Sequence, residues 1–168
     1  ALFYLHGFNA DNDKDPVKAG QSLLERYAYN RDELGKDELS QADSNEILGG
    51  KDLDKAWVDG FERCRSRTDD DCFDKILAQL THSKLDTPRL SLMLERYQTL
   101  TQYEDFAYLN GFTFNSPHPG YAFPMALQQL TLAKAAQTNS TVHFFAVVEK
   151  DLKFWRMLLV KGNSLIDK

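Results

Sequence analysis

The chain has 168 residues, of which 42% are hydrophobic and 27% charged, a composition typical of a globular protein and not of a disordered one. Its net charge of −5 and its pI near 5.3 argue against a nucleic-acid partner, because Lys and Arg are scattered and form no basic patch. No apolar run approaches the roughly 18 residues that span a bilayer, so we expect membrane contact only through a segment that this chain lacks.

The N-terminal part begins with an apolar run and then shows a clear helix start. We expect residues 1–8 to form an extended or helical arm laid on the core. Asp15 followed by Pro16 combines a capping side chain with a preset φ, which predicts a helix that runs to about Tyr29. The polar stretch 30–45 shows no periodicity, so we predict a loop or a short exposed turn there.

The acidic segment 11–15, DNDKD, has the alternating acids of a calcium-binding loop. That loop also needs Gly at its sixth position and Glu at its twelfth, where this chain has Pro16 and Ser22. We therefore interpret the segment as the capping loop of the helix that follows.

Four further helices are predicted between residues 52 and 137. A short one is expected over residues 52–61, and Thr68 with three Asp residues opens another over 69–84. Thr87 and Pro88 repeat the cap-and-proline pattern and start a helix over 88–102. Pro124 lies near the start of a helix over 122–137.

A last helix is predicted over 141–161, after a short polar turn. Its apolar residues lie on nearly every side, so we expect it to be central to its bundle. The pairs 69–84/88–102 and 122–137/141–161 are typical of antiparallel helix hairpins. Together these patterns predict a single all-α domain, an irregular bundle of helix hairpins of about five to six helices, with a long aromatic loop.

That loop is the most distinctive feature of the sequence. Seven aromatic residues lie between residues 103 and 123, mixed with Gly, Pro and Asn: Tyr103, Phe106, Tyr108, Phe112, Phe114, Tyr121 and Phe123. In one interpretation the rings turn inward and close one end of the helical core. In the other, several rings face a groove and bind a sugar, peptide or protein partner. The candidate binding residues are the first six of the seven.

The sequence contains no recognisable catalytic or metal-binding motif. The four histidines are widely spread, no phosphate-binding glycine loop or nucleophile elbow occurs, and we predict neither metal nor cofactor. Cys64 and Cys72 are separated by seven polar residues, so they are within reach of a disulfide or are two unrelated thiols.

Three stretches of the chain resemble a family of uncharacterised Gram-negative envelope proteins: FYLHGFNA with DPVKAG, LERYQTL, and DLKFWRMLLVKGNSLIDK. In that family an N-terminal membrane helix precedes a helical periplasmic domain. The resemblance implies a periplasmic location with an inner-membrane anchor, and it implies that Cys64 and Cys72 are joined. The family pattern continues beyond Lys168, so we expect the chain to be a fragment that lacks the N-terminal anchor and further C-terminal helices.

These observations favour a non-enzymatic envelope-side module that binds a protein or, as a weaker candidate, a cell-wall glycan. Two alternatives stay open. One is a hydrolase acting on envelope material through Asp and Glu residues, with His118 in a cleft beside the aromatic loop. The other is an immunity-type protein that neutralises a toxin in the periplasm. Two carboxylates facing each other across an open groove would favour the hydrolase.

Overall fold

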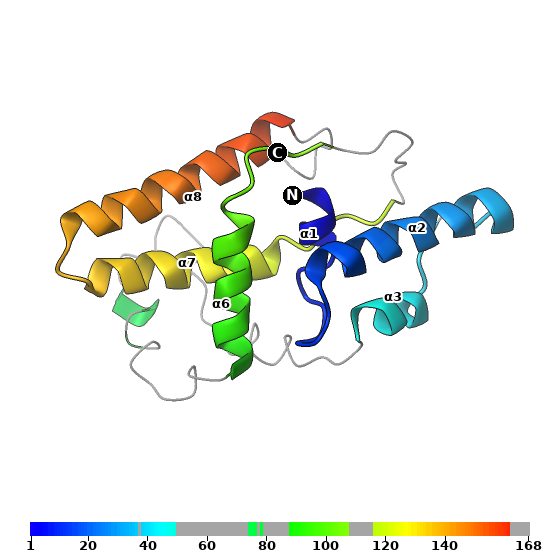
Figure 1. The fold of residues 1–168 in the computed structure, drawn as a ribbon, viewed down its shortest axis with the longest axis horizontal. Coiled ribbons are helices and arrows are strands. Elements are labelled where there is room, and N and C mark those ends of the chain that lie inside the picture. Colours follow the sequence, from blue (N-terminus) through cyan, green and yellow to red (C-terminus); the bar gives the residue numbers. More distant parts are fainter. Residues whose placement is uncertain (37, 50–73, 77, 79–87, 108–115, 162–168) are drawn as a thin grey trace. The chain divides into compact units, whose positions relative to one another are not determined.

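The computed structural model describes residues 1–36, 38–49, 74–76, 78, 88–107 and 116–161 (Figure 1). Within these ranges every regular element is a helix and no strand is present, so the all-α prediction is confirmed. None of the described helices is long and apolar enough to cross a membrane. The predicted helix over 52–61 and the two cysteines lie outside the described residues.

The chain forms two compact units. The first combines residues 1–52, 103–120 and 157–168, and the second combines residues 53–102 and 121–156. The first unit contains α1 (Leu2–His6), α2 (Pro16–Leu34) and α3 (Gln41–Leu48). The second contains α6 (Pro88–Leu100), α7 (Ala122–Gln137) and most of α8 (Thr141–Lys161).

In the first unit α1 packs on α2 with their backbones in close contact. A Cβ atom added at Gly20 would collide with the carbonyl oxygen of Phe3, and one added at Gly7 would collide with that of Pro16. Glycine at both positions therefore permits the approach. The N-terminal arm is helical and buried, which agrees with the helical form of the prediction.

Helix α2 starts as predicted, since the Asp15 side chain accepts hydrogen bonds from the amides of Val17 and Lys18 at 2.8 and 3.1 Å. The prediction of a loop over 30–45 was wrong at both ends. Helix α2 continues to Leu34 and ends at Gly35, whose φ of 62° lies in the left-handed region. Helix α3 then begins at Gln41.

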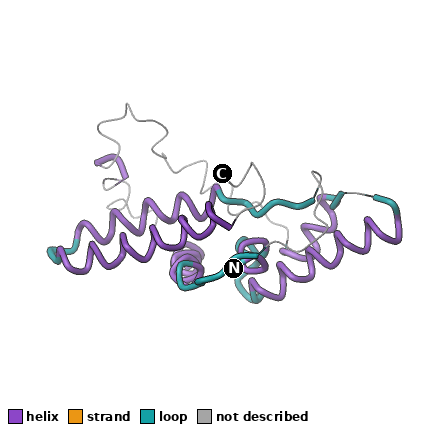
Figure 2. The backbone as a smooth tube through the Cα atoms, turned by 90° about the horizontal axis from the view of Figure 1, so that it is seen from above, coloured by secondary structure: helices purple, strands orange, loops and turns teal. Residues whose placement is uncertain are grey.

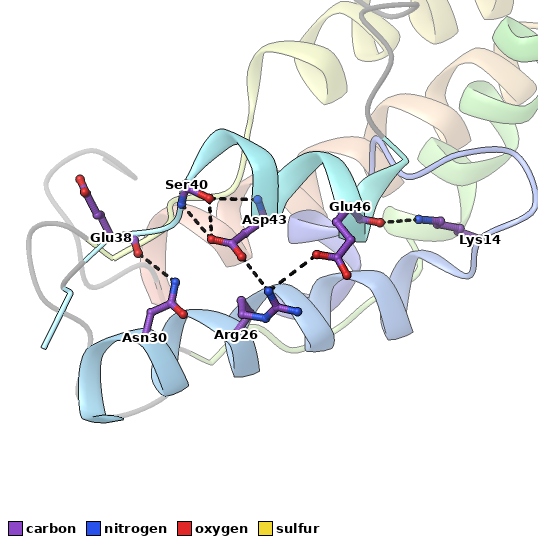
Figure 3. A network of polar contacts seen from close by, with 7 residues as sticks. All are labelled: Lys14, Arg26, Asn30, Glu38, Ser40, Asp43 and Glu46. Atoms are coloured by element: carbon purple, nitrogen blue, oxygen red, sulfur yellow. Dashed lines mark hydrogen bonds and ion pairs between the residues drawn. The ribbon is translucent and has the colours of Figure 1, made fainter. Parts of the chain in front are cut away.

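Helix α3 is held by polar contacts, because none of its residues is buried (Figure 3). Ser40 and Asp43 form a reciprocal capping box at its start. Arg26 of α2 lies 2.7 Å from the Asp43 carboxylate and 3.8 Å from that of Glu46. Hydrogen bonding from Ser40, followed by the Arg26 guanidinium, lowers the pKa of Asp43 below its ordinary value.

In the second unit α7 and α8 run side by side as an antiparallel hairpin (Figure 2), joined through residues 138–140. Both helices have the bounds predicted from the sequence. Helix α6 contacts α7 and contributes apolar residues to the same core. The core of this unit contains Leu90, Met93, Tyr97, Leu100, Ala126, Leu127, Leu130, Ala133 and Phe154.

Helix α8 differs from the prediction in one respect. Its apolar composition indicated a central helix, but most of its residues are exposed, and the buried ones fall on one side, at Asp151, Phe154 and Leu158. The helix therefore lies at the surface of the fold.

Candidate interaction surface

The outer face of α8 carries large apolar side chains in contact with solvent. Val142 is 82% exposed, Phe145 63% and Leu152 53%, and Leu159 and Val160 are exposed as well. Phe145, Leu152 and Leu159 recur every seven residues, so they form one row along the helix. We call this row, together with Val142 and Val160, the outer face of α8.

Charged residues of both signs border the outer face. Glu149 and Arg156 are each four residues after an apolar member of the row, which places them beside it on the helix surface. Lys153 lies next to Leu152 along the chain, and all three charged residues are exposed. An apolar centre with a mixed-charge border has the character of a protein-binding surface.

A buried polar cluster fixes the opposite side of α8. Asp151 is 4% exposed, and its carboxylate accepts hydrogen bonds from the Tyr97 hydroxyl of α6 and from Nε2 of Gln128 of α7. Nε1 of Trp155 donates to the Tyr97 hydroxyl at 3.1 Å. Burial, followed by the negative charge of Asp151, raises the pKa of Tyr97, so the phenol stays protonated as a donor.

This cluster connects α6, α7 and α8 through the carboxylate of Asp151. The two groups that donate to that carboxylate, from Tyr97 and Gln128, are both neutral. A buried charge is costly unless it is hydrogen-bonded, so the arrangement is stable only when α8 has one particular rotation about its axis. The same rotation places Phe145 and Leu152 in solvent.

A cavity of about 430 Å³ lies beside the cluster, between α6, α7 and α8. The exposed side chains of Lys134, His143 and Lys150 contribute to its wall, and Asp151 is the one carboxylate among its described lining. Lys150 also donates to the carbonyl oxygen of Gln98 at 3.5 Å. The described lining therefore contains no pair of carboxylates of the kind that a glycoside hydrolase uses.

A second cavity, of about 370 Å³, lies within the first unit. Its described lining includes His6, His118 and Asn9, with Glu38 as the one carboxylate. His118 thus lies in a cavity, as the hydrolase alternative supposed, but the described lining again supplies a single carboxylate. In the described part of the chain no group of three or more His, Cys, Asp or Glu residues could hold a metal ion.

The described residues of the aromatic segment lie in different surroundings. Tyr103 is half-buried with its ring centroid 5.6 Å from that of Tyr4, and Phe106 is 2% exposed in the core of the first unit. Tyr121 belongs to the second unit, where its half-buried ring lies 6.5 Å from that of Trp155. Tyr108, Phe112 and Phe114 lie outside the described residues.

The outer face of α8 was not among the predicted binding residues. The sequence does contain a signal for it, because the seven-residue row of Phe145, Leu152 and Leu159 is bordered by Glu149 and Arg156. An apolar helix that is fully enclosed would have no need of charges beside that row.

Comparisons of the chain with protein-family models, with curated proteins and with solved structures found no match in any of the three.

Proposed function

We propose that this protein is a non-enzymatic helical module that binds a protein partner through the outer face of α8. The observation that carries the proposal is the exposure of Phe145 and Leu152 on a helix whose other side is held by a buried carboxylate. Covering the exposed parts of these two side chains would contribute roughly 1 to 2 kcal/mol each to binding.

The shape of the surface favours a protein over a small molecule. The outer face extends from Val142 to Val160, which corresponds to about 27 Å at the rise of an α-helix. An elongated row of that length fits another helix or a groove. The opposite signs of Glu149 and Arg156 beside the apolar row match the polar rim of a protein interface.

The aromatic segment stays a second candidate surface. Phe106 is buried, while Phe112 and Phe114 lie outside the described residues and keep their predicted role. If these two rings contact the partner, changing both to Ala will weaken partner capture and leave the melting temperature nearly unchanged. A large fall in the melting temperature would assign them to the core instead. A cell-wall glycan stays the weaker candidate ligand, since sugars stack on aromatic rings and Phe145 is the one aromatic residue of the outer face of α8.

We further propose that the module works on the periplasmic side of a bacterial envelope, attached to the inner membrane by a segment outside this chain. The resemblance of three short stretches supports this location, and the pairing of Cys64 with Cys72 that the same resemblance implies would persist in an oxidising compartment. If the module is an immunity-type protein, its protein partner would be a toxin that it neutralises in the periplasm.

The test compares two Leu→Glu variants as baits. Leu152→Glu places a charge in the outer face of α8, and Leu34→Glu makes the same change at a site of nearly equal exposure, 51% against 53%, on α2. Each chain, together with the wild type, is immobilised and exposed to envelope extract, and the captured proteins are quantified by mass spectrometry.

We expect at least one protein to be captured by the wild type and by Leu34→Glu and lost from Leu152→Glu. Circular dichroism should show equal helix content in all three, because both leucines are exposed. Retention of every captured protein by Leu152→Glu would contradict the proposed function.

A further inference from the structure

We propose that a second copy of this chain is a partner of the outer face of α8, with the two α8 helices antiparallel about a two-fold axis between Leu152 and Lys153. The inference rests on the proposed function, because it names a partner for the same surface. Three observations carry it: the apolar row whose members recur every seven residues, the positions of Glu149 and Arg156, and the exposure of all these side chains.

The positions of the two charges make the surface self-complementary. Glu149 and Arg156 lie at equal distances along the helix on either side of the point midway between residues 152 and 153. In an antiparallel pair about that point, Glu149 of each copy therefore faces Arg156 of the other. A two-fold axis repeats the contact, so one interface contains two ion pairs of opposite charge.

The same register also matches the apolar residues. Leu152 of each copy lies at the axis beside Leu152 and the aliphatic stem of Lys153 of the other copy. Phe145 lies level with Val160 of the second copy, so the exposed Phe145 ring is covered at each end of the interface. The apolar row is thus closed by the arrangement that pairs the charges.

A parallel arrangement lacks these ion pairs. Glu149 and Arg156 are each four residues after a member of the row, so both lie on the same side of it. A two-fold axis parallel to the helices would place each charge level with its own copy on the opposite side of the interface, so Glu149 of one copy would not meet Arg156 of the other. The charge pattern therefore selects the antiparallel pair.

The expected strength follows from the size of the surface. One face of a single helix is at the low end of the area that specific protein interfaces bury. We therefore expect a dissociation constant in the micromolar range, on the order of 10 to 100 μM.

The experiment is sedimentation velocity of the full 168-residue chain over concentrations from about 5 to 500 μM, with three charge variants. Glu149→Arg and Arg156→Glu each place like charges across the interface twice, and each should weaken self-association by roughly tenfold or more. The double variant restores opposite charges with exchanged positions and should return the dissociation constant to within about threefold of the wild type. Circular dichroism of each variant checks that the fold is intact.

Two results would overturn the self-association. One is a wild type that stays monomeric up to the highest concentration. The other is a double variant that associates no better than the single ones, because that result removes the contact between Glu149 and Arg156. If either occurs while Leu152→Glu still loses a protein captured from envelope extract, the outer face binds a different protein and the proposed function survives. If Leu152→Glu changes neither self-association nor capture, both proposals fail.

Discussion

The hydroxyl group of Tyr97 connects α6 to the buried carboxylate of α8. Removing this hydroxyl group therefore tests directly how much the buried polar cluster stabilises the second unit. Tyr97 is 1% exposed, and its hydroxyl donates to Asp151 and accepts from Nε1 of Trp155. Tyr97→Phe keeps the ring and its packing and removes only the oxygen. The variant leaves Asp151 with one hydrogen-bond donor, Gln128, in place of two.

The cost of Tyr97→Phe can be worked out from the charge and the burial of the group that loses its donor. A hydrogen bond to a charged acceptor contributes about 1.5 to 3 kcal/mol, and a buried acceptor left without its donor keeps its desolvation cost. We therefore expect the free energy of unfolding to fall by about 2 to 3 kcal/mol. For a chain of this length that loss corresponds to a fall in the melting temperature of roughly 4 to 12 °C.

The measurement is urea denaturation followed by far-UV circular dichroism. Tryptophan fluorescence is unsuitable, because Nε1 of Trp155 donates to the Tyr97 hydroxyl and the substitution itself would change the Trp155 signal. Tyr29→Phe is the matched control, since Tyr29 is 56% exposed and the same change there should alter stability by less than about 0.5 kcal/mol.

A double-mutant cycle with Asp151→Asn isolates the contact. We expect a coupling energy of about 1 kcal/mol or more between Tyr97→Phe and Asp151→Asn. A coupling energy below about 0.5 kcal/mol would show that the hydroxyl and the carboxylate do not depend on each other, and it would refute the reasoning.

Three further predictions concern other parts of the molecule. Gly20→Ala should lower the free energy of unfolding by about 1 to 3 kcal/mol in chemical denaturation, because its Cβ meets the backbone of α1. Gly120→Ala is the control and should leave the stability unchanged, since the space around Gly120 is open. Equal stabilities of the two variants would contradict the close approach of α1 and α2. The pKa of Asp43 is lowered in the folded state, so its stabilising contribution is present at neutral pH and is lost as the pH falls through the folded pKa, below about pH 4. Acid titration followed by circular dichroism should therefore show that the wild type loses more stability than Asp43→Asn. If both proteins lose the same stability as the pH falls, the Asp43 carboxylate does not stabilise the fold in this way. Mass spectrometry without reductant should find the peptides of Cys64 and Cys72 joined, and free thiols would refute the disulfide.

Helix boundaries were predictable wherever the chain carries local stop and start chemistry. Asp15 with Pro16 predicted the start of α2, and Pro88 marks the start of α6. The polar turn before Thr141 correctly separated α7 from α8. These signals act on the backbone directly, through caps and missing amide donors, so they need no knowledge of tertiary contacts.

Helix α3 was missed because the prediction relied on apolar periodicity. That helix has two large apolar residues, Ile47 and Leu48, which are adjacent and only half-buried, so it shows no apolar periodicity to detect. It is stabilised by the capping box of Ser40 and Asp43, by the left-handed Gly49 at its end and by Arg26 of α2. The capping box and Gly49 are visible in the sequence, whereas the contact with Arg26 depends on how α2 and α3 pack.

The candidate surface was harder to predict than the fold. A helix with apolar residues on most sides can be enclosed by neighbours or can present one side to a partner, and composition alone does not separate the two. The sequence also gives no sign that Asp151 is the buried acid while Glu149 is exposed, because that difference depends on Tyr97 and Gln128 from two other helices. The aromatic segment stood out by composition, yet Phe106 is a core residue.

At three positions of α8 the polarity is the reverse of what folding alone would favour. A carboxylate is buried at Asp151, while a phenylalanine and a leucine are in solvent at Phe145 and Leu152. Rotating the helix to bury those two would take Asp151 away from Tyr97 and Gln128, and it would also remove Phe154 and Leu158 from the core. The buried polar cluster therefore fixes the helix in the rotation that keeps its apolar row exposed. A fixed and solvent-facing apolar row is typical of a surface that another molecule covers, so the inner cluster and the outer face both support the proposed binding function.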